Sequence, residues 1–266
     1  MHKNPNHEAQ PRTYQCFDAH CHIIDSRFPL VENQGYLPQD FIAAEYLSKL
    51  DTLSIKRSGS AIVSGSFQAG DVSYLLDAIE VLGDTTVGVI NADSSYSDDY
   101  ILSLHQQGIR AMRFNLFRGC SLPFSTIATL AQRVYDLAQW HVEFYLDASH
   151  LPDLDGLLKQ LPLFSIDHLG LAKLGVPHLL KWVDRGARVK ACGFMRTDFE
   201  VGAVLKQIHS VNPSALLFGS DLPGTRASRQ FDRSDLDTIT RLFTDDQVQD
   251  ILNNNAMQWY ITRFQA

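Results

Sequence analysis

The segment FDAHCHIID, Phe17 to Asp25, carries two histidines two positions apart within an apolar run. An extended strand directs residues i and i+2 to the same face, so His20 and His22 should project together, with Cys21 on the other face in packing. Two imidazoles at a strand end can hold a divalent cation or polarise a carbonyl oxygen, although histidines also occur as hydrogen-bonded core residues. The segment therefore predicts a strand, and the rest of the chain must decide what its histidines do.

Seven further short apolar or β-branched runs follow, and helical periodicity separates most of them. The eight runs span residues 16–23, 60–67, 85–91, 109–116, 142–148, 163–168, 188–194 and 215–220. Alternating strands and helices indicate a parallel sheet, and eight such units fit a (β/α)₈ barrel better than an open doubly wound sheet, whose glycine-rich first turn is missing here. We predict an α/β fold, a single-domain (β/α)₈ TIM barrel over residues 16–266, preceded by a flexible polar tail over residues 1–15.

Helical periodicity is clearest over residues 45–57, 73–83, 125–141 and 197–210. Ser125 and Thr197 are good N-cap residues for the last two of these segments. An amphipathic region over residues 245–264 should close the barrel with C-terminal helices.

The composition narrows the classes of function. The chain has 266 residues, of which 45% are hydrophobic and 20% charged, and its formal net charge is −7. That charge provides no general attraction for nucleic acid or acidic membranes, so an anionic substrate would have to be captured by individual arginines. The four cysteines form no CxxC pair, and no signal sequence or membrane segment is recognisable, so we expect a cytoplasmic protein with no nucleic acid or membrane partner.

Polar residues follow three of the predicted strands. His20 and His22 end the first, His168 follows the sixth, and Asp221 follows the eighth. Because the carboxyl ends of all strands meet at one mouth of a barrel, these four side chains should converge there. A helix cap at His168 and a turn at Asp221 would explain each residue separately but not their coincidence. We predict that the four form a catalytic group.

Other polar residues at strand ends are candidates for substrate binding. Arg113 and Arg118 belong to or follow the fourth strand, and Arg196 follows the seventh. A guanidinium in a cleft can bind a carboxylate through two parallel hydrogen bonds, although surface arginines are usually solvated. Tyr145 on the fifth strand and Ser66 after the second could donate hydrogen bonds to a substrate, with packing and a loop position as the alternatives.

Five segments, taken in order, resemble one known family. They are FDAHCHIID (17–25), GIRAMRFNLF (108–117), FSIDHLG (164–170), LLFGSDLP (216–223) and ILNNNAMQWY (251–260). The chain is similar to the amidohydrolase-related branch of the amidohydrolase superfamily, especially its lactonases for pyrone dicarboxylates and sugar lactones. The resemblance extends over residues 17–260 and implies a (β/α)₈ barrel that hydrolyses a small lactone.

The resemblance also implies roles for the candidate residues. Asp221 would be the general base that takes a proton from water, and His20, His22 and His168 would stabilise the oxyanion. The same resemblance would place Arg113, Arg196, Tyr145 and Ser66 on the substrate, and Arg118 is added from its position after the fourth strand. Two positions depart from the family pattern: Leu171 stands where an arginine is common, and Gly224 where a histidine is common. We therefore keep both a carboxylated lactone and a sugar lactone as candidate substrates.

The cofactor expectation has two forms. The fourth and fifth strands carry Arg113 and Tyr145 where binuclear relatives place metal ligands, and a positive Arg113 would oppose a second cation. We expect either no cofactor or one divalent ion, Zn²⁺ or Mn²⁺, held by His20, His22 and Asp221.

Three other functions are considered. A metal-dependent decarboxylase of the same superfamily should have a histidine on the fifth strand, and none is predicted there. A TatD-like nuclease also begins with a similar histidine motif but should show a basic face. A non-catalytic barrel that binds a carboxylate would bind lactones without releasing acid. We expect a monomer or a homodimer.

Overall fold

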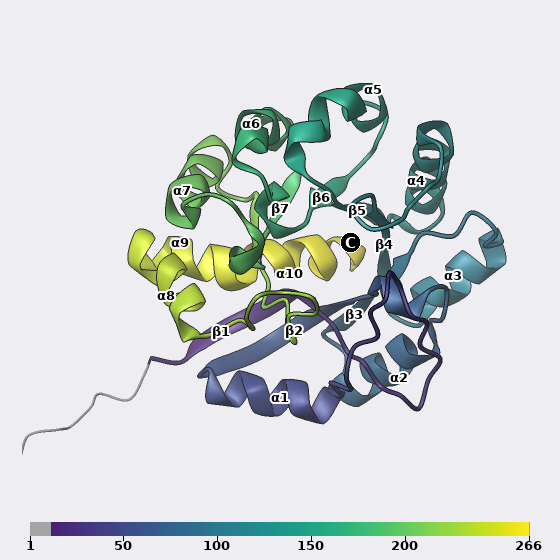
Figure 1. The fold of residues 1–266 in the computed structure, drawn as a ribbon, viewed down its shortest axis with the longest axis horizontal. Coiled ribbons are helices and arrows are strands. Elements are labelled where there is room, and N and C mark those ends of the chain that lie inside the picture. The colour runs from purple at the N-terminus through teal and green to yellow at the C-terminus, as the bar shows by residue number, and fades with distance from the viewer. Residues whose placement is uncertain (1–11, 266) are drawn as a thin grey trace, which may run out of the picture.

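Eight parallel strands form one sheet in the order β1 to β8, as the computed structural model shows for residues 12–265 (Figure 1). The strands are β1 (Tyr14–Cys21), β2 (Ile55–Val63), β3 (Thr86–Asn91), β4 (Ile109–Asn115), β5 (His141–Tyr145), β6 (Phe164–Ile166), β7 (Arg188–Ala191) and β8 (Leu216–Phe218). The sheet curls into a nearly closed barrel, which confirms the predicted (β/α)₈ fold. The predicted tail over residues 1–15 falls mainly on residues 1–11, which lie outside the described part, while β1 already includes Tyr14.

The barrel closes where the segment after β8 meets β1. The Asp221 amide donates to the His20 carbonyl at 2.7 Å, and the His22 amide donates to the Leu222 carbonyl at 2.8 Å. Asp18 adds a side-chain link, because its carboxylate accepts from the Ser220 amide at 2.8 Å and from the Ser220 hydroxyl. These bonds satisfy polar groups that a gap in the ladder would leave without partners.

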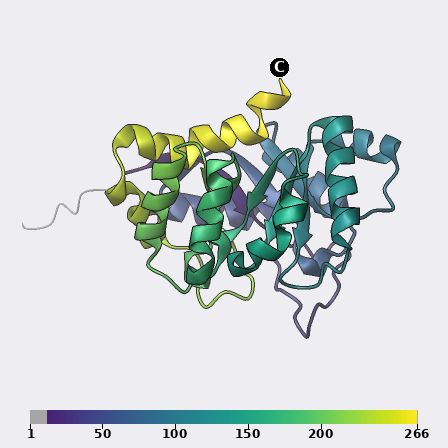
Figure 2. The same cartoon turned by 90° about the horizontal axis from the view of Figure 1, so that it is seen from above.

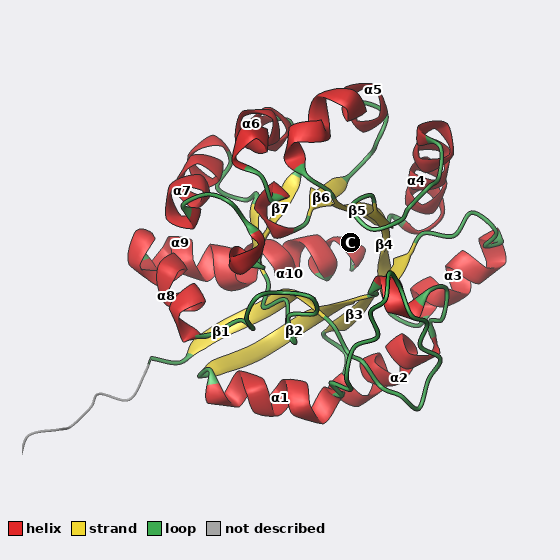
Figure 3. Ribbon diagram, viewed as in Figure 1, coloured by secondary structure: helices red, strands yellow, loops and turns green. Residues whose placement is uncertain are grey.

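Helices surround the strands on the outside (Figure 3). They are α1 (Ala43–Thr52), α2 (Ser73–Leu82), α3 (Asp98–Gln106), α4 (Phe124–Ala138), α5 (Asp155–Leu158), α6 (Val176–Asp184), α7 (Val201–Val211), α8 (Arg233–Leu242), α9 (Asp245–Gln249) and α10 (Asn255–Tyr260). The C-terminal helices run along one end of the barrel (Figure 2). There Tyr260 stacks on Phe17 with ring centroids 5.6 Å apart, so α10 covers the end opposite the carboxyl ends of the strands.

The barrel interior has an apolar half and a charged half. Phe17, Val63, Val89 and Leu217 belong to an inner apolar cluster contributed by β1 to β4 and β8. On β5 and β7, by contrast, Glu143 and Lys190 are fully buried. Buried charges need partners, so the charged half must contain a polar network.

Local boundaries differ from the sequence expectations at several places. Ser125, expected as an N-cap, lies inside α4, whose cap position is Pro123. The helix predicted over residues 45–57 ends at Thr52, and β2 begins at Ile55. The residues from Ile55 to Arg57 instead pair with β1 as the first part of β2. The helix predicted from Thr197 begins at Val201, because the Glu200 carboxylate accepts from the Gly202 and Ala203 amides and caps it there.

Within residues 12–265, none of the helices is both long and apolar enough to cross a membrane.

Candidate active site

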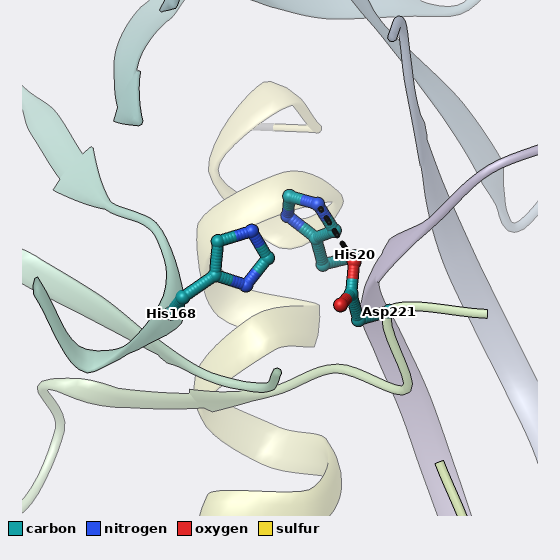
Figure 4. Close-up of side chains that lie close together, drawn as sticks. All are labelled: His20, His168 and Asp221. Carbon is teal, nitrogen blue, oxygen red and sulfur yellow. Dashed lines mark ion pairs between the residues drawn. The ribbon is translucent and has the colours of Figure 1, made fainter. Parts of the chain in front are cut away.

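Backbone hydrogen bonds at the barrel seam bring Asp221 next to the histidines of β1. The bond from the Asp221 amide to the His20 carbonyl fixes the first contact. A Cβ on Gly219 would lie 2.8 Å from the His20 Cβ, so glycine permits this close approach. Asp221 has φ of +56°, a left-handed conformation that is strained for a non-glycine residue. Figure 4 shows the result, in which Asp221, His20 and His168 point toward one another.

The two carboxylate oxygens of Asp221 differ in their partners. Oδ2 accepts from Arg196 Nε at 2.7 Å, whereas the buried Oδ1 has no hydrogen-bond partner within the described chain. Oδ1 lies 3.6 Å from His22 Nε2 and 3.9 Å from His20 Nε2. Burial alone would raise the pKa of the Asp221 carboxyl, but the surrounding histidines and Arg196 outweigh this and hold the pKa below its usual range. Asp221 is therefore an ionised carboxylate with one free oxygen.

The hydrogen bonds at Nδ1 bear on whether the other ring nitrogen, Nε2, carries a hydrogen in His20 and in His22. His22 Nδ1 lies 2.7 Å from the Val63 carbonyl, which only accepts, so the neutral ring carries its hydrogen on Nδ1 and a lone pair on Nε2. His20 Nδ1 lies 3.3 Å from Lys190 Nζ and 3.4 Å from Asp167 Oδ1, and while it accepts from Lys190 the ring hydrogen is on Nε2. Burial lowers the pKa of His20 to about 4, which keeps this ring neutral at neutral pH. Thus, with Lys190 as the donor to its Nδ1, His20 offers a hydrogen at Nε2 where His22 offers a lone pair.

His168 reaches the site from the turn after β6, and sequence reasoning placed it correctly beside His20. Their ring centroids lie 4.8 Å apart. His168 has φ of +52°, and a Cβ on Gly193 would lie 2.5 Å from its Nδ1, so both the strained backbone and a neighbouring glycine are needed to seat the ring. Burial holds the pKa of His168 well below its usual value. We call His20, His22, His168, Asp221 and Arg196 the mouth cluster.

A second group of buried polar residues lies deeper in the barrel. Glu143 accepts from Lys190, from Tyr260 and from His141, the last at 3.1 Å. All four residues are fully buried, and every polar side-chain atom among them has a partner. We call His141, Glu143, Lys190 and Tyr260 the interior cluster, and Lys190 joins it to the mouth cluster through His20.

The expected substrate-binding arginines are largely engaged within the protein. Arg113 forms an ion pair with the buried Asp167 at 2.9 Å, and Arg196 is paired with Asp221. Arg118 has no acidic partner among residues 12–265. Of the three arginines predicted for substrate contact, only Arg118 therefore has a guanidinium without an acidic partner in the part of the chain that the structure describes.

A pocket at the carboxyl ends of the strands contains all five predicted binding residues. It is lined by Ser66, Arg113, Arg118, Tyr145 and Arg196, together with His22, His168 and Arg226. It adjoins an outer cavity of about 300 Å³ that shares Ser66, Arg113 and Arg118 with it. Leu171 is buried outside both spaces, and Gly224 contributes no side chain to either. The combined space suits a small molecule.

Sequence reasoning missed several residues of this region. Lys190, Asp167 and Arg226 were not singled out, although a lysine in the middle of an apolar run was a usable signal for a buried charge. The prediction that the fifth strand lacks a histidine is wrong, because β5 begins at His141. That histidine lies at the opposite end of the barrel, however, bonded to Glu143 and packed on Trp259 with centroids 4.8 Å apart, so it cannot serve the mouth.

The donor set can be tested against a metal ion. His20, His168 and Asp221 offer ligand atoms within 4.8 Å of one another, so the metal-compatible group includes His168, which the expected set lacked. His22 Nε2 and Asp221 Oδ1 face each other as two acceptors, which also suits one cation. His20 would have to move its hydrogen to Nδ1, where Asp167 Oδ1 lies 3.4 Å away as an alternative acceptor. These residues fit one divalent ion.

The fold and this arrangement of strand-end histidines and aspartate define an amidohydrolase-type barrel. The amidohydrolase family model matches residues 17–261, and the chain belongs to that family.

One relative carries the name of a lactone hydrolase. The chain is 30% identical over 184 residues to a 2-pyrone-4,6-dicarboxylate hydrolase from Comamonas testosteroni, a match that covers 67% of this chain and 58% of that protein.

Solved structures share the fold at lower identity. An Agrobacterium tumefaciens protein solved without ligand has a TM-score of 0.83 at 19% identity, covering 95% of this chain and 98% of its own. An Acinetobacter baumannii protein, described as a "probable" 2-pyrone-4,6-dicarboxylic acid hydrolase with citric acid bound, has a TM-score of 0.76 at 22% identity, covering 92% and 98%.

Proposed function

We propose that this protein hydrolyses a small carboxylated lactone, with Asp221 as the general base. The observation that carries the proposal is Oδ1 of Asp221, a buried carboxylate oxygen that has no hydrogen-bond partner within residues 12–265 and faces His20 and His22. Unsatisfied buried polar atoms are rare and often mark functional positions. The name of the Comamonas relative and the citric acid held by the Acinetobacter protein support a carboxylated substrate.

In the proposed reaction, Asp221 Oδ1 takes a proton from a water molecule as the water oxygen attacks the lactone carbonyl carbon. The negative charge that develops on the carbonyl oxygen is stabilised by the Nε2 hydrogen of His20, and His168 adds to the polar environment of that oxygen. The bond from the carbonyl carbon to the ring oxygen then breaks, and Asp221 returns its proton to that oxygen. The products are one hydroxyl group and one carboxylic acid on an opened chain, and the acid loses its proton to solvent to become a carboxylate.

Arg196 holds Asp221 in place and keeps it ionised. Tyr145 lines the pocket, packs edge-on against His168 and has no hydrogen-bond partner for its hydroxyl among residues 12–265, so we assign it to orienting the substrate. Ser66, on the other wall of the pocket, is assigned the same task.

One divalent ion, if bound by His20, His168 and Asp221, would supply Lewis-acid polarisation of the carbonyl. In either case Asp221 provides the proton transfers, whereas the oxyanion contact from the Nε2 hydrogen of His20 exists only without the ion. The expected monomer or homodimer stays a prediction.

The test is a pH-indicator assay of the purified protein on carboxylated and neutral lactones, with the metal content measured and with Zn²⁺ or Mn²⁺ added or chelated. Ring opening releases acid, whereas a decarboxylase would release carbon dioxide and a non-catalytic barrel would bind without acid release. Absence of acid release from every lactone under every metal condition would refute the proposal.

A further inference from the structure

Lys190 directs its ammonium group into the barrel interior, where three acceptors surround it. The ammonium donates to Glu143, lies 3.3 Å from His20 Nδ1 and lies 3.6 Å from Asp167 Oδ1. All four side chains are fully buried. An ammonium has three hydrogens and no lone pair, so Lys190 can only donate to His20. It therefore favours the form of the ring whose Nδ1 carries a lone pair.

Asp167 favours the opposite form of the same ring. Its Oδ2 accepts from Arg113 Nε at 3.0 Å, whereas its Oδ1 has no hydrogen-bond partner within residues 12–265. That Oδ1 lies 3.4 Å from His20 Nδ1. A carboxylate oxygen only accepts, so Asp167 favours the form of the ring whose Nδ1 carries the hydrogen. The two neighbours of Nδ1 therefore compete for it at almost equal distances.

This competition decides what His20 presents at the mouth of the barrel. Its Nε2, on the other edge of the ring, lies 3.9 Å from Asp221 Oδ1 and has no hydrogen-bond partner in the described part of the chain (Figure 4). A neutral imidazole has one hydrogen for its two nitrogens. When Lys190 donates to Nδ1, Nε2 carries the hydrogen. When Asp167 accepts from Nδ1, Nε2 carries a lone pair, and the charge of the ring is the same in both forms.

We propose that Lys190 and Asp167 are positioning residues that select between the two neutral tautomers of His20. With Lys190 engaged, Nε2 is a donor for an oxyanion; with Asp167 engaged, Nε2 is a ligand for a divalent ion. Because both partners are already in place, the ring serves either state without a change of rotamer. The use of the donor rests on the proposed function, whereas the selection itself does not.

Nitrogen-15 NMR of the histidine-labelled, metal-free protein shows which ring nitrogen carries the hydrogen, and His20→Gln identifies the His20 signals. The comparison is between Glu143→Gln, which keeps Lys190, and the double variant Lys190→Met with Glu143→Gln, which removes the ion pair as a whole. The hydrogen should lie on Nε2 in the wild type and in Glu143→Gln, and on Nδ1 in the double variant. A hydrogen on Nε2 in the double variant would overturn the proposal.

Titration with Zn²⁺ provides a second measurement. The double variant should bind Zn²⁺ about 10- to 100-fold more tightly than Glu143→Gln, the usual size of an effect from a partner of a metal-binding histidine, and equal affinities would overturn the selection. Loss of the lysine charge also favours a cation, but it does not move the hydrogen that NMR locates.

Asp167→Asn tests the other partner, and it keeps the proposal open to refutation if the lysine variant does not fold. A neutral amide oxygen is a weaker acceptor for the Nδ1 hydrogen, so this variant should bind Zn²⁺ about 10- to 100-fold more weakly than the wild type. The matched control is Asp153→Asn, whose side chain is 78% exposed. An unchanged Zn²⁺ affinity in Asp167→Asn would refute the role of Asp167.

Kinetics of the chelated enzyme link the selection to the reaction. The double variant should have a kcat about 100-fold below that of Glu143→Gln with a similar KM, because the oxyanion loses its donor. If the wild type opens no lactone but the His20 hydrogen moves as expected, the selection stands and the proposed function fails. If lactones are opened but the hydrogen stays on the same nitrogen in both variants, the selection fails and the proposed function stands.

Discussion

The mouth cluster and the interior cluster bury ionisable residues in the same barrel, yet they satisfy them differently. Every polar side-chain atom of the interior cluster has a partner, and three of its four residues lie on regular strands. In the described part of the chain, the mouth cluster leaves His20 Nε2 and Asp221 Oδ1 without hydrogen-bond partners and holds two residues at positive φ. Satisfied buried charge is typical of structure, whereas strain and free polar atoms are typical of chemistry. The comparison predicts that changes in the two clusters will separate activity from stability.

The largest effect is expected at Asp221. Asp221→Asn removes the proton acceptor while preserving shape, so kcat should fall about 10³-fold with a thermal midpoint close to that of the wild type. Steady-state kinetics and thermal unfolding measure the two quantities. The matched control is Asp153→Asn, which changes a side chain that is 78% exposed. Near-normal turnover in Asp221→Asn would sink the assignment of the base.

The interior cluster should respond most strongly at Lys190. Lys190→Met leaves the buried Glu143 charge without its cation, and breaking such a pair costs about 3 to 5 kcal/mol of unfolding free energy. Adding Glu143→Gln to this variant should recover part of the loss, because the uncompensated charge is then gone as well. Denaturant titrations of both proteins provide the measurement. Equal stability of the single and double variants would mean that the ion pair does not support the fold.

Two histidines provide a direct test of the comparison. His168→Asn should lower kcat about 100-fold, the order expected for losing one oxyanion contact, with little change in stability. His141→Asn should do the reverse, because it leaves Glu143 with one donor fewer at the far end of the barrel. Activity and unfolding are measured on both proteins. If the two variants behaved alike, the division into a chemical and a structural cluster would be wrong.

The smallest effect is a shared dependence of stability on pH. Burial lowers the pKa of both His20 and His141 to about 4, below the value near 6.5 of an unfolded histidine. Unfolding therefore takes up protons between these values, so stability is complete above about pH 6.5 and falls as the pH drops toward 4. Each histidine contributes up to about 1.4 kcal/mol per pH unit in this window.

Urea unfolding at pH 7.5, 6.0 and 5.0 measures this slope. His141→Asn should make it shallower, since one of the buried histidines is gone. An unchanged slope in that variant would show that His141 is protonated or exposed in the folded state.

Much of this architecture was predictable from local patterns. The eight apolar runs and the helical segments between them define the barrel, and the barrel rule then brings His20, His168 and Asp221 to one mouth. The partners of the charged side chains could not be predicted in the same way. Whether Arg113 faces a substrate or Asp167 depends on side-chain geometry across three strands, which no spacing encodes.

The missed residues have the same explanation. Arg226 lies in a loop, and only the fold reveals that its guanidinium enters the pocket beside Arg118. Lys190 is recognisable in sequence as a charge within an apolar run, but its contact with His20 joins β7 to β1 across the interior.

The hydrogen bonds between His20 and Asp221 and between His22 and Leu222 join the first strand of the barrel to the segment after the last. The residues that they align are about two hundred positions apart, so the site does not exist until almost the whole polypeptide has emerged and folded. A chain stalled before β8 would have most of its secondary structure and no catalytic centre. The rate at which turnover recovers after dilution from denaturant would therefore report when the barrel closes. Circular dichroism responds mainly to helices that have already formed, so it would not detect this step.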